Sequence, residues 1–487
     1  MKTFFEYDID DFKLYTKQLC KEKARKIHFY ERQKMIDFYG IFDSEEKFCE
    51  QVIDNFKQGS IRHKIENTSF STSYIENLAK ISNNTKLYAQ TAEAVLNTFR
   101  YIFYNHKIGI YVQIRNNKLT YFNFIENYDY RHPYKKYLKI DPKFNKEVTQ
   151  DVLDKAKITG CLIKFSHYGE SELQYMTFYY HEYYYFLRRL CEKRKVSDVD
   201  FFLNFRDQHL LKGDLTIPFH NIVNSRSIPL ETHKYKIYCP IVSFSSKRGF
   251  IDLPTMTPDD IRYMYKQYFA PICDNVYADN RFVFRNWNDK RATAMFRGTS
   301  TGCSFDINKN PRLLITKINK EWHFDKKTNK LNNIDGVPYL NAGIISFSGR
   351  FKKEYGREFI TKMGKLNLKR MPFMKLKEQS RYKYQLYIEG NSLGYRLAFL
   401  FSLGSVVLYV KSPFKSWFHN LLVDRENCVF IERDFSNLYD VITWLKKNDN
   451  EAKRIAKNGL KLYNEHLNGE HLFDYKKILI DFIANTY

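Results

Sequence analysis

The chain has 487 residues and a formal net charge of +24. This length is too great for one hydrophobic core, so we expect two domains plus an appendage, and no apolar run is long enough to span a membrane. The charge suits nucleic acid, an anionic membrane surface or an anionic nucleotide, while eight scattered cysteines without a Cys-x-x-Cys pair argue against a disulfide framework or a zinc site.

The first quarter of the chain contains no recognisable chemistry. Residues 1–98 read as helices with faces rich in Lys and Glu, and we expect them to form a helical extension. Two β-rich runs, 108–114 and 119–124, flank the turn Arg-Asn-Asn, which predicts a β-hairpin.

From residue 161 onward, strands alternate with helices. We expect strands at 162–165, 200–205 and 237–244, and helices at 178–192 and from Pro258 to about residue 268. This alternation predicts a parallel sheet. Asp207 follows the buried strand 200–205, and ligands bind at the carboxyl ends of strands in open α/β sheets.

A second α/β unit begins at residue 294, after a hinge region at 270–290. Its expected strands are 294–298, 312–316, 385–388, 405–410 and 428–431, and its expected helices are one that carries Arg396 and those at 438–447, 451–466 and 473–484. The sequence therefore predicts a second layered α/β structure.

The segment Tyr382–Val410 has the pattern of an anion site. A strand runs into the turn Glu389-Gly390-Asn391-Ser392, and a helix with Arg396 follows before a wholly apolar strand. Unpaired N–H groups and the dipole at a helix N-terminus favour negative charge, and an arginine can fork onto a diphosphate. The alternative is an ordinary β-α-β crossover with a capped helix.

The segment Ala294–Thr301, AMFRGTST, repeats the pattern. An apolar run ends in Arg297-Gly298 and continues with the hydroxyl residues Thr299, Ser300 and Thr301. A plain polar turn is the alternative. Two such segments, each pairing an arginine with glycine and hydroxyls, favour a nucleotide diphosphate as the ligand.

These two segments, the intervening NPRLLI, and the tail DFSNLYDVITWLKKNDNEAKRIAKNGLKLYNEHL resemble glycosyltransferase family 90. The family holds protein O-glucosyl/xylosyltransferases and fungal capsule-associated proteins, and the resemblance covers roughly Leu162 to Phe482. It implies an α/β fold of the GT-B type, a UDP-sugar donor, an inverting mechanism and no metal or other cofactor.

The implied fold has two Rossmann-like domains that face each other across a cleft. With the helical extension, the expected division is 1–98 for the extension, 99–270 for the acceptor-side domain, 271–465 for the nucleotide-sugar domain and 466–487 for a helix that crosses back.

In a donor site of this kind, Arg297 and Arg396 would neutralise the diphosphate as the glycosidic bond breaks. The residues expected to line the same pocket are Gly298, Thr299, Thr301, Gly390, Asn391, Ser392 and Tyr395. Many relatives have a serine two residues before the second arginine. This chain has Gly394 there, so Ser392 is expected to supply the phosphate hydroxyl.

The catalytic base is expected to be a carboxylate that takes the proton of the acceptor hydroxyl. Relatives use an aspartate, whereas the matching segment His167–Gln174 offers Glu170 and Glu172, of which we favour Glu172. The alternative is that both are solvated loop acids. Asp207, in FFLNFRDQ, is expected to orient the acceptor or sugar hydroxyls, with a structural pair of Arg206 and Asp207 as the alternative.

Two Asp-x-Asp pairs could suggest a metal-bound donor, as in GT-A transferases. They are Asp8 with Asp10, and Asp198 with Asp200. The second pair stands at the start of a strand, the wrong end for such a site. We interpret both pairs as cap or loop acids and expect no metal.

The predicted function is transfer of glucose or xylose from a UDP-sugar to a hydroxyl of a protein or glycan. One alternative is a degenerate member that binds a nucleotide sugar or glycan without turnover. Another is a nucleic-acid-binding protein, although no such motif is present and no nucleic-acid partner is expected. The first residues, MKTFFEYDIDDFKLYTK, have no apolar signal-peptide region, so we expect a cytoplasmic or virion-associated protein.

Overall fold

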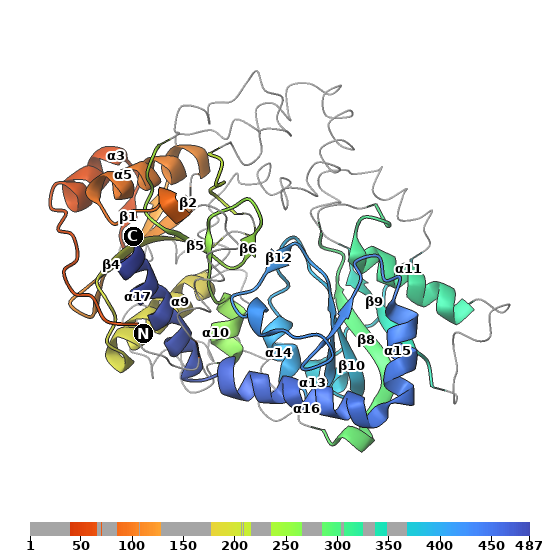
Figure 1. The fold of residues 1–487 in the computed structure, drawn as a ribbon. Helices are drawn as coiled ribbons and strands as arrows, with labels where there is room; N and C mark the ends of the chain where they lie inside the picture. The colour runs from red at the N-terminus through yellow and green to blue at the C-terminus, as the bar shows by residue number, and fades with distance from the viewer. Residues whose placement is uncertain are drawn as a thin grey trace, which may run out of the picture.

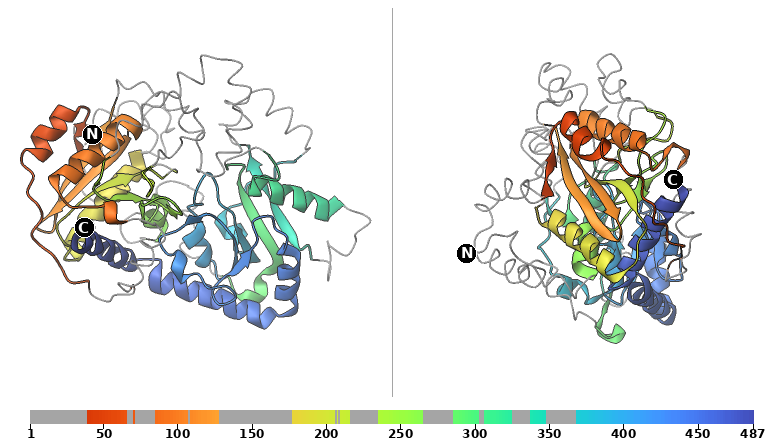
Figure 2. Two further views of the ribbon diagram at one scale, coloured as in Figure 1. Left: turned by 45° about the horizontal axis from the view of Figure 1, so that its top comes forward. Right: turned by 90° about the vertical axis from the view of Figure 1, so that its left-hand side faces the viewer.

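The computed structural model describes residues 39–65, 70, 85–106, 108–127, 177–205, 207, 209–215, 235–264, 285–302, 306–324, 337–347 and 368–487. Two large sheets, with helices on their faces, organise these residues, and a two-stranded sheet is the third (Figures 1 and 2).

The first sheet has six strands in the order β1-β3-β2-β4-β5-β7. The strands are β1 (Ile41–Phe42), β2 (Ile108–Arg115), β3 (Lys118–Glu126), β4 (Val199–Asn204), β5 (Ile241–Ser243) and β7 (Leu253–Pro254). β4, β5 and β7 are parallel neighbours, as the alternation of strands and helices predicted, and β1 is parallel to β3. β2 runs antiparallel to β3 and β4, so the sheet as a whole is mixed. The predicted hairpin is confirmed, and Asn116 and Asn117 form its turn with φ of 50° and 59°.

The described part of the first 98 residues belongs to this sheet. β1 pairs with β3, which corrects the expectation of a wholly helical segment. Around it lie α3 (Glu45–Phe48), the π-helical turn η2 (Cys49–Ile53), η3 (Thr85–Leu87), α5 (Ala92–Arg100) and η4 (Tyr101–His106). The rings of Phe48 and Phe99 stack 4.0 Å apart, so these helices share the core of the sheet.

The second sheet has five parallel strands in the order β13-β11-β10-β8-β9. The strands are β8 (Arg291–Thr299), β9 (Leu340–Ser346), β10 (Tyr382–Tyr387), β11 (Val406–Val410) and β13 (Val429–Ile431). From β8 the chain goes to β9 on one side and then to β10, β11 and β13 on the other. The direction of winding therefore reverses between β8 and β10, which makes this the switch point of a doubly wound sheet.

One predicted strand of this unit is wrong. Residues 312–316 lie in the helix α11 (Pro311–Phe324). The side chain of Asn310 accepts hydrogen bonds from the backbone N–H groups of Arg312 and Leu313, and Pro311 occupies the first helical position. These contacts start a helix despite the β-branched residues that follow.

The remaining helices cover the two sheets. They are α9 (Thr177–Lys193), α10 (Pro258–Met264), η9 (Trp287–Asp289), α13 (Leu376–Gln379), α14 (Leu397–Phe401), η10 (His419–Leu421), α15 (Leu438–Lys447), α16 (Asp449–His466) and α17 (His471–Thr486). α16 packs on β11 and α14, while α17 packs on α9 and β4 of the first sheet. A two-stranded sheet of β6 (Ser246–Lys247) and β12 (Phe414–Lys415) also connects the two parts.

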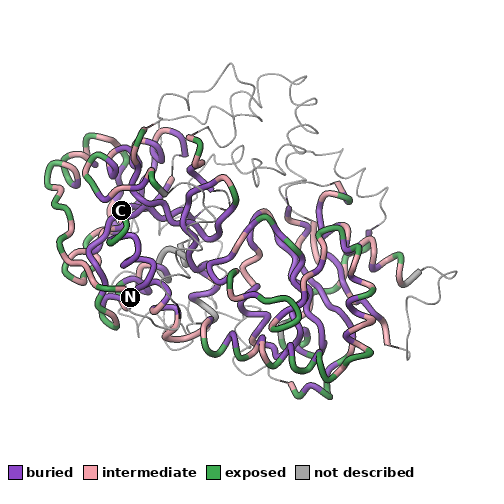
Figure 3. Tube along the Cα trace, in the orientation of Figure 1, coloured by how far each residue is buried: buried purple, intermediate pink, exposed green. Residues whose placement is uncertain are grey.

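Two clusters of buried apolar side chains hold these layers together. Figure 3 marks in purple where the buried residues lie along the chain. One fills the first sheet and its helices and continues into α14. The other lies between the second sheet and α15 and α16. Because α14 belongs to the first cluster while its flanking strands reach the second, the turn that precedes α14 lies where the two parts meet.

Candidate functional site

The two turns singled out in the sequence lie at adjacent strand ends. Gly298–Thr301 is at the carboxyl end of β8 and Glu389–Ser392 directly follows β10, its hydrogen-bonded neighbour. The pair therefore stands at the switch point of the second sheet. Ligands bind at this position in open α/β sheets.

Arg312, at the start of α11, connects the two turns. Its Nε donates to the Glu389 carbonyl (2.8 Å) and its Nη2 to the Ile388 carbonyl (3.0 Å). Its Nη1 donates to the Thr299 carbonyl (3.0 Å) and to Oγ1 of Thr301 (2.6 Å). One buried guanidinium thus fixes the shape of both turns. This role of Arg312 was not predicted from the sequence, although Asn310-Pro311 is a helix-start signal that could have indicated it.

Arg396 is the second arginine at this place. It is half-buried at the N-cap of α14, and its Nη1 donates to the carbonyl of Arg297 (2.5 Å). Within the described residues its other N–H groups have no hydrogen-bond partner, so they are free to bind an anion. α14 has only five residues, so the helix dipole invoked from the sequence contributes little here.

Arg297 lies differently from the expectation that it shares a diphosphate with Arg396. Its guanidinium is buried and donates to the carbonyls of Phe296 (2.9 Å), Asn341 (2.8 Å) and Pro372 (3.2 Å), and to Oδ1 of Asn341 (2.7 Å). Burial of the guanidinium lowers the pKa of Arg297. Because side chains alternate along a strand, Arg297 points away from the face that carries Phe296 and Gly298.

Arg312 and Arg396, in contrast, both lie near the ring of Phe296. The guanidinium carbons of Arg312 and Arg396 lie 5.8 and 5.9 Å from the centroid of the Phe296 ring. The N–H groups of Arg312 donate to the two turns, whereas Arg396 has N–H groups that make no hydrogen bond within the described residues. The first would shape an anion site and the second would bind the anion.

The turn after β10 also reaches the first sheet. Asn391 Oδ1 accepts from the N–H of Gly302 (3.1 Å), and its Nδ2 donates to Oδ2 of Asp207 (3.2 Å). The hydroxyl of Tyr395 donates to Oδ1 of Asp207 (3.3 Å). Three of the predicted residues, from two sheets, are thus in direct contact.

The other predicted residues of the two turns make contacts within their own part of the chain or are buried. Thr299 shares a hydrogen bond with the hydroxyl of Ser346 (3.1 Å), and Gly390 donates its N–H to the carbonyl of Ser392 (3.0 Å). The side chain of Ser392 is buried. Glu170 and Glu172, the candidate bases, lie outside the described residues.

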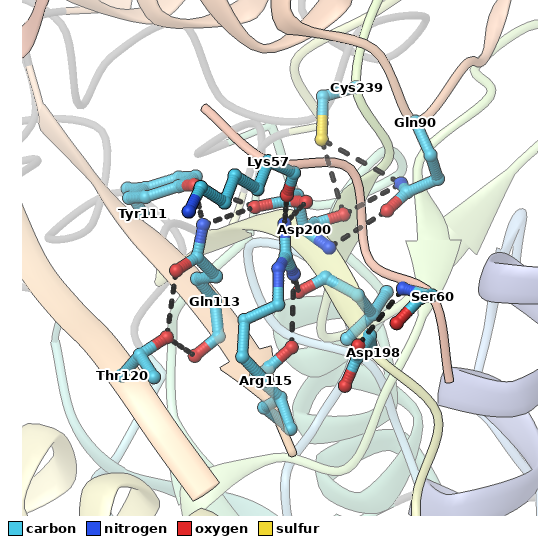
Figure 4. Close-up of polar contacts among 12 residues, drawn as sticks. Lys57, Ser60, Gln90, Tyr111, Gln113, Arg115, Thr120, Asp198, Asp200 and Cys239 are labelled. Carbon is cyan, nitrogen blue, oxygen red and sulfur yellow. Dashed lines mark hydrogen bonds and ion pairs between the residues drawn. The ribbon is translucent and has the colours of Figure 1, made fainter. Parts of the chain in front are cut away.

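Asp198 and Asp200 stand at the start of β4 and are held by the protein (Figure 4). Asp200 is buried, pairs with Arg115 (2.5 Å) and accepts from the Tyr111 hydroxyl (2.6 Å). Asp198 accepts from the backbone N–H groups of Ser60, Ile61 and Asn116. Both carboxylates therefore have structural roles. Asp198 precedes β4 as the interpretation of a loop acid requires, whereas Asp200 lies within β4 and is neither a cap nor a loop acid. Asp8 and Asp10 lie outside the described residues.

The described part of the chain holds no group of three or more His, Cys, Asp or Glu side chains placed to bind a metal ion. None of its helices is long and apolar enough to cross a membrane.

Comparison with known proteins places the chain in a class of proteins that transfer sugars. The profile of glycosyl transferase family 90 matches residues 119–486, and the chain belongs to this family. It is 25% identical to Uncharacterized protein 035R of Invertebrate iridescent virus 3, over 97% of this chain and 44% of that protein. It is 26% identical to Protein O-glucosyltransferase 3 of Homo sapiens, over 59% of this chain and 47% of that protein. The chain thus spans less than half the length of either relative.

Proposed function

We propose that the chain transfers a sugar from a UDP donor to a hydroxyl of a protein or glycan acceptor. Membership of family 90 supports glycosyl transfer as the reaction class. The observation that carries the proposal is Arg396, half-buried at the switch point of the second sheet with N–H groups left for a ligand. Similarity to a protein O-glucosyltransferase favours glucose as the sugar, with xylose as the second choice.

In this mechanism Arg396 binds the diphosphate and stabilises the charge that develops as UDP leaves. Arg312 holds the Thr299–Thr301 and Glu389–Asn391 turns in the shape that receives it. A glutamate, Glu172 in preference to Glu170, takes the proton of the acceptor hydroxyl while that oxygen attacks the anomeric carbon. The anomeric configuration is inverted and no metal takes part.

The first experiment measures UDP binding and donor use. UDP should raise the melting temperature, since a ligand at a hundredfold its Kd stabilises by about 2.7 kcal/mol. Hydrolysis of UDP-glucose, UDP-xylose, UDP-galactose and UDP-N-acetylglucosamine is then compared with and without EDTA. We expect one donor to be hydrolysed equally in both conditions, and sensitivity to EDTA would refute the metal-free mechanism.

The Arg396→Ala variant tests the site itself. It should lose at least tenfold in UDP affinity and most of the transfer activity while it stays folded with a melting temperature a few degrees below that of the parent, because Arg396 makes one internal hydrogen bond and one contact with the Phe296 ring. Arg454→Ala is the matched control, since Arg454 lies on the exposed face of α16 in surface ion pairs. Undiminished transfer by Arg396→Ala would count against the assignment.

A degenerate member that binds UDP without turnover is the second candidate. It is favoured by the replacement of the expected aspartate by Glu170 and Glu172. UDP binding without hydrolysis of any donor, and without transfer to acceptors, would identify it.

Relatives in iridescent viruses support a further proposal, that the chain acts in the cytosol or in a virion.

A further inference from the structure

Residues 369–381, which lead into β10, combine an exposed aromatic ring with cations that have no ionic partner. Phe373 is 51% exposed, and Val423 is the other exposed large apolar side chain among the described residues. Five cations of the segment are exposed and make no ion pair within the part of the chain that the structure describes: Lys369, Arg370, Lys375, Lys377 and Arg381. Glu378 is the one acid of the segment. A single exposed ring is ordinary, but a ring among five unpaired cations indicates an interaction surface.

Buried side chains hold the backbone on both sides of Phe373. Nε of Arg297 donates to the carbonyl of Pro372 (3.2 Å), and Nε2 of Gln379 donates to the carbonyl of Met374 (2.8 Å). Arg297 and Gln379 are both buried, so the two carbonyls are fastened to the body of the second sheet. The ring of Phe373 is therefore presented to the outside by a backbone that is held in place.

Val423 is equally exposed, but its surroundings differ. Asp424 and Glu426 follow it closely in the chain. Glu426 forms an ion pair with Arg454 (2.9 Å), so charges of both signs lie near this apolar side chain. The excess of unpaired positive charge is thus a property of the segment around Phe373 and not of every exposed apolar residue.

We propose that residues 369–381 are a peripheral binding surface for an anionic lipid membrane. Acidic headgroups attract Lys and Arg side chains, and an aromatic ring among these cations enters the boundary between headgroups and acyl chains. Five cations against one acid are complementary to a negatively charged partner. Lipid fits better than nucleic acid, because single strands are bound on several stacked rings and a duplex by an element that enters a groove. The proposal goes beyond sugar transfer and does not depend on the donor site.

Co-sedimentation of the full chain with vesicles tests the role of the cations. Vesicles of phosphatidylcholine with about 30% phosphatidylserine should sediment the parent chain, whereas vesicles of phosphatidylcholine alone should not. A triple variant removes three cations of the surface: Lys369→Gln, Arg370→Gln and Lys375→Gln. It should bind on the order of a hundredfold more weakly, about fivefold for each cation.

A second triple variant controls for the net charge of +24, which would draw the whole chain to an anionic surface. It removes the same number of cations from the exposed face of α16: Lys453→Gln, Lys457→Gln and Lys461→Gln. This control should bind much more like the parent than like the first triple variant.

Two substitutions test whether the ring of Phe373 enters the lipid. Phe373→Ala should weaken vesicle binding about fivefold, whereas Val423→Ala should leave it unchanged. Phe373→Trp should still bind, and lipids brominated on their acyl chains should quench its fluorescence more than that of the parent. Val423→Trp should show no such additional quenching. All substituted side chains are exposed, so each variant should keep the melting temperature and the UDP affinity of the parent.

Equal losses in the two triple variants would overturn the proposal, because the net charge alone would then explain the binding. Parental binding by Phe373→Ala, or no additional quenching in Phe373→Trp, would overturn it as well. Binding of an RNA or DNA oligonucleotide through the same cations, without binding of vesicles, would assign the surface to nucleic acid instead. A parent chain that binds vesicles but no UDP would refute the proposed function and leave the membrane surface standing.

Discussion

Three arginines of the second sheet illustrate what a sequence can tell about single residues. The glycine- and hydroxyl-rich turns were found from the sequence because small residues after a strand are a local pattern. The direction of the Arg297 side chain was not, because it depends on acceptors at Asn341 and Pro372, far along the chain. The importance of Arg312 likewise depends on four acceptors in two distant turns.

Arg297 should therefore matter for stability more than for binding. Arg297→Ala removes a buried guanidinium together with its hydrogen bonds to Phe296, Asn341 and Pro372, and we expect the unfolding free energy to fall by about 2–4 kcal/mol. Urea denaturation followed by far-ultraviolet circular dichroism measures this. Arg454→Ala, an exposed arginine, should change it by less than about 1 kcal/mol. If Arg297→Ala keeps full stability but loses UDP affinity, the original pairing of Arg297 with Arg396 is correct.

At the scale of elements, local patterns predicted the C-terminal part of the chain well. The helix at 438–447 is observed with those bounds, and the strand–turn–strand order around Arg396 is confirmed. The wrong predictions concern elements whose conformation depends on other parts of the structure. β1 becomes a strand only because β3 is beside it, and the β-branched run after Pro311 is helical because Asn310 and Pro311 start a helix.

The position of the Phe296 ring requires glycine at position 298. A Cβ there would lie 2.8 Å from this ring, which would have to shift, and 3.5 Å from Nη1 of Arg312, which is an ordinary contact. Because the guanidinium groups of Arg312 and Arg396 both lie near the ring, Gly298→Ala should disturb the site, and UDP affinity should fall by roughly tenfold or more. Calorimetry measures the affinity, and Lys457→Ala on the exposed face of α16 serves as the control. Parental affinity in Gly298→Ala would show that the turns tolerate the shift.

For the whole molecule, the join between the two sheets includes a buried acid. Asp260, in the first turn of α10, is 4% exposed and accepts from the backbone N–H of Thr257 (2.8 Å) and from Nε1 of Trp417 (2.9 Å), which follows β12. Burial raises the pKa of Asp260 to about 7, with a smaller contribution from Asp259. No sequence pattern indicates this shift, because it follows from packing between two parts of the chain.

The sign of the resulting pH dependence follows from proton linkage. In the unfolded chain Asp260 titrates near its ordinary pKa of 3.8, so between about pH 4 and 7 the folded state binds the proton more tightly. Asp260 therefore makes the unfolding free energy fall as the pH rises through this range, by on the order of a few kcal/mol. Asp252, whose pKa burial raises to about 6, acts in the same direction.

Burial also lowers the pKa of Lys290 and of Lys476 to about 7, so these groups make stability rise above that pH. The contribution of Asp260 is therefore isolated only by the difference in unfolding free energy between the parent chain and a variant at position 260.

Asp260→Asn should accordingly flatten the decline of stability between pH 5 and 8. The amide keeps an acceptor for Thr257 and Trp417 but has no charge to desolvate, so the variant should gain on the parent as the pH rises. Urea denaturation at several pH values, followed by tryptophan fluorescence, measures the difference in unfolding free energy. Asp434→Asn is the control: Asp434 is exposed and its pKa is lowered by hydrogen bonds to Ser436, so its contribution is complete well below pH 5. A difference between Asp260→Asn and the parent that stays constant from pH 5 to 8 would mean that the Asp260 carboxyl does not titrate in this range. The carboxyl group of Asp260, between the two sheets, would then not be protonated in the folded chain in this range.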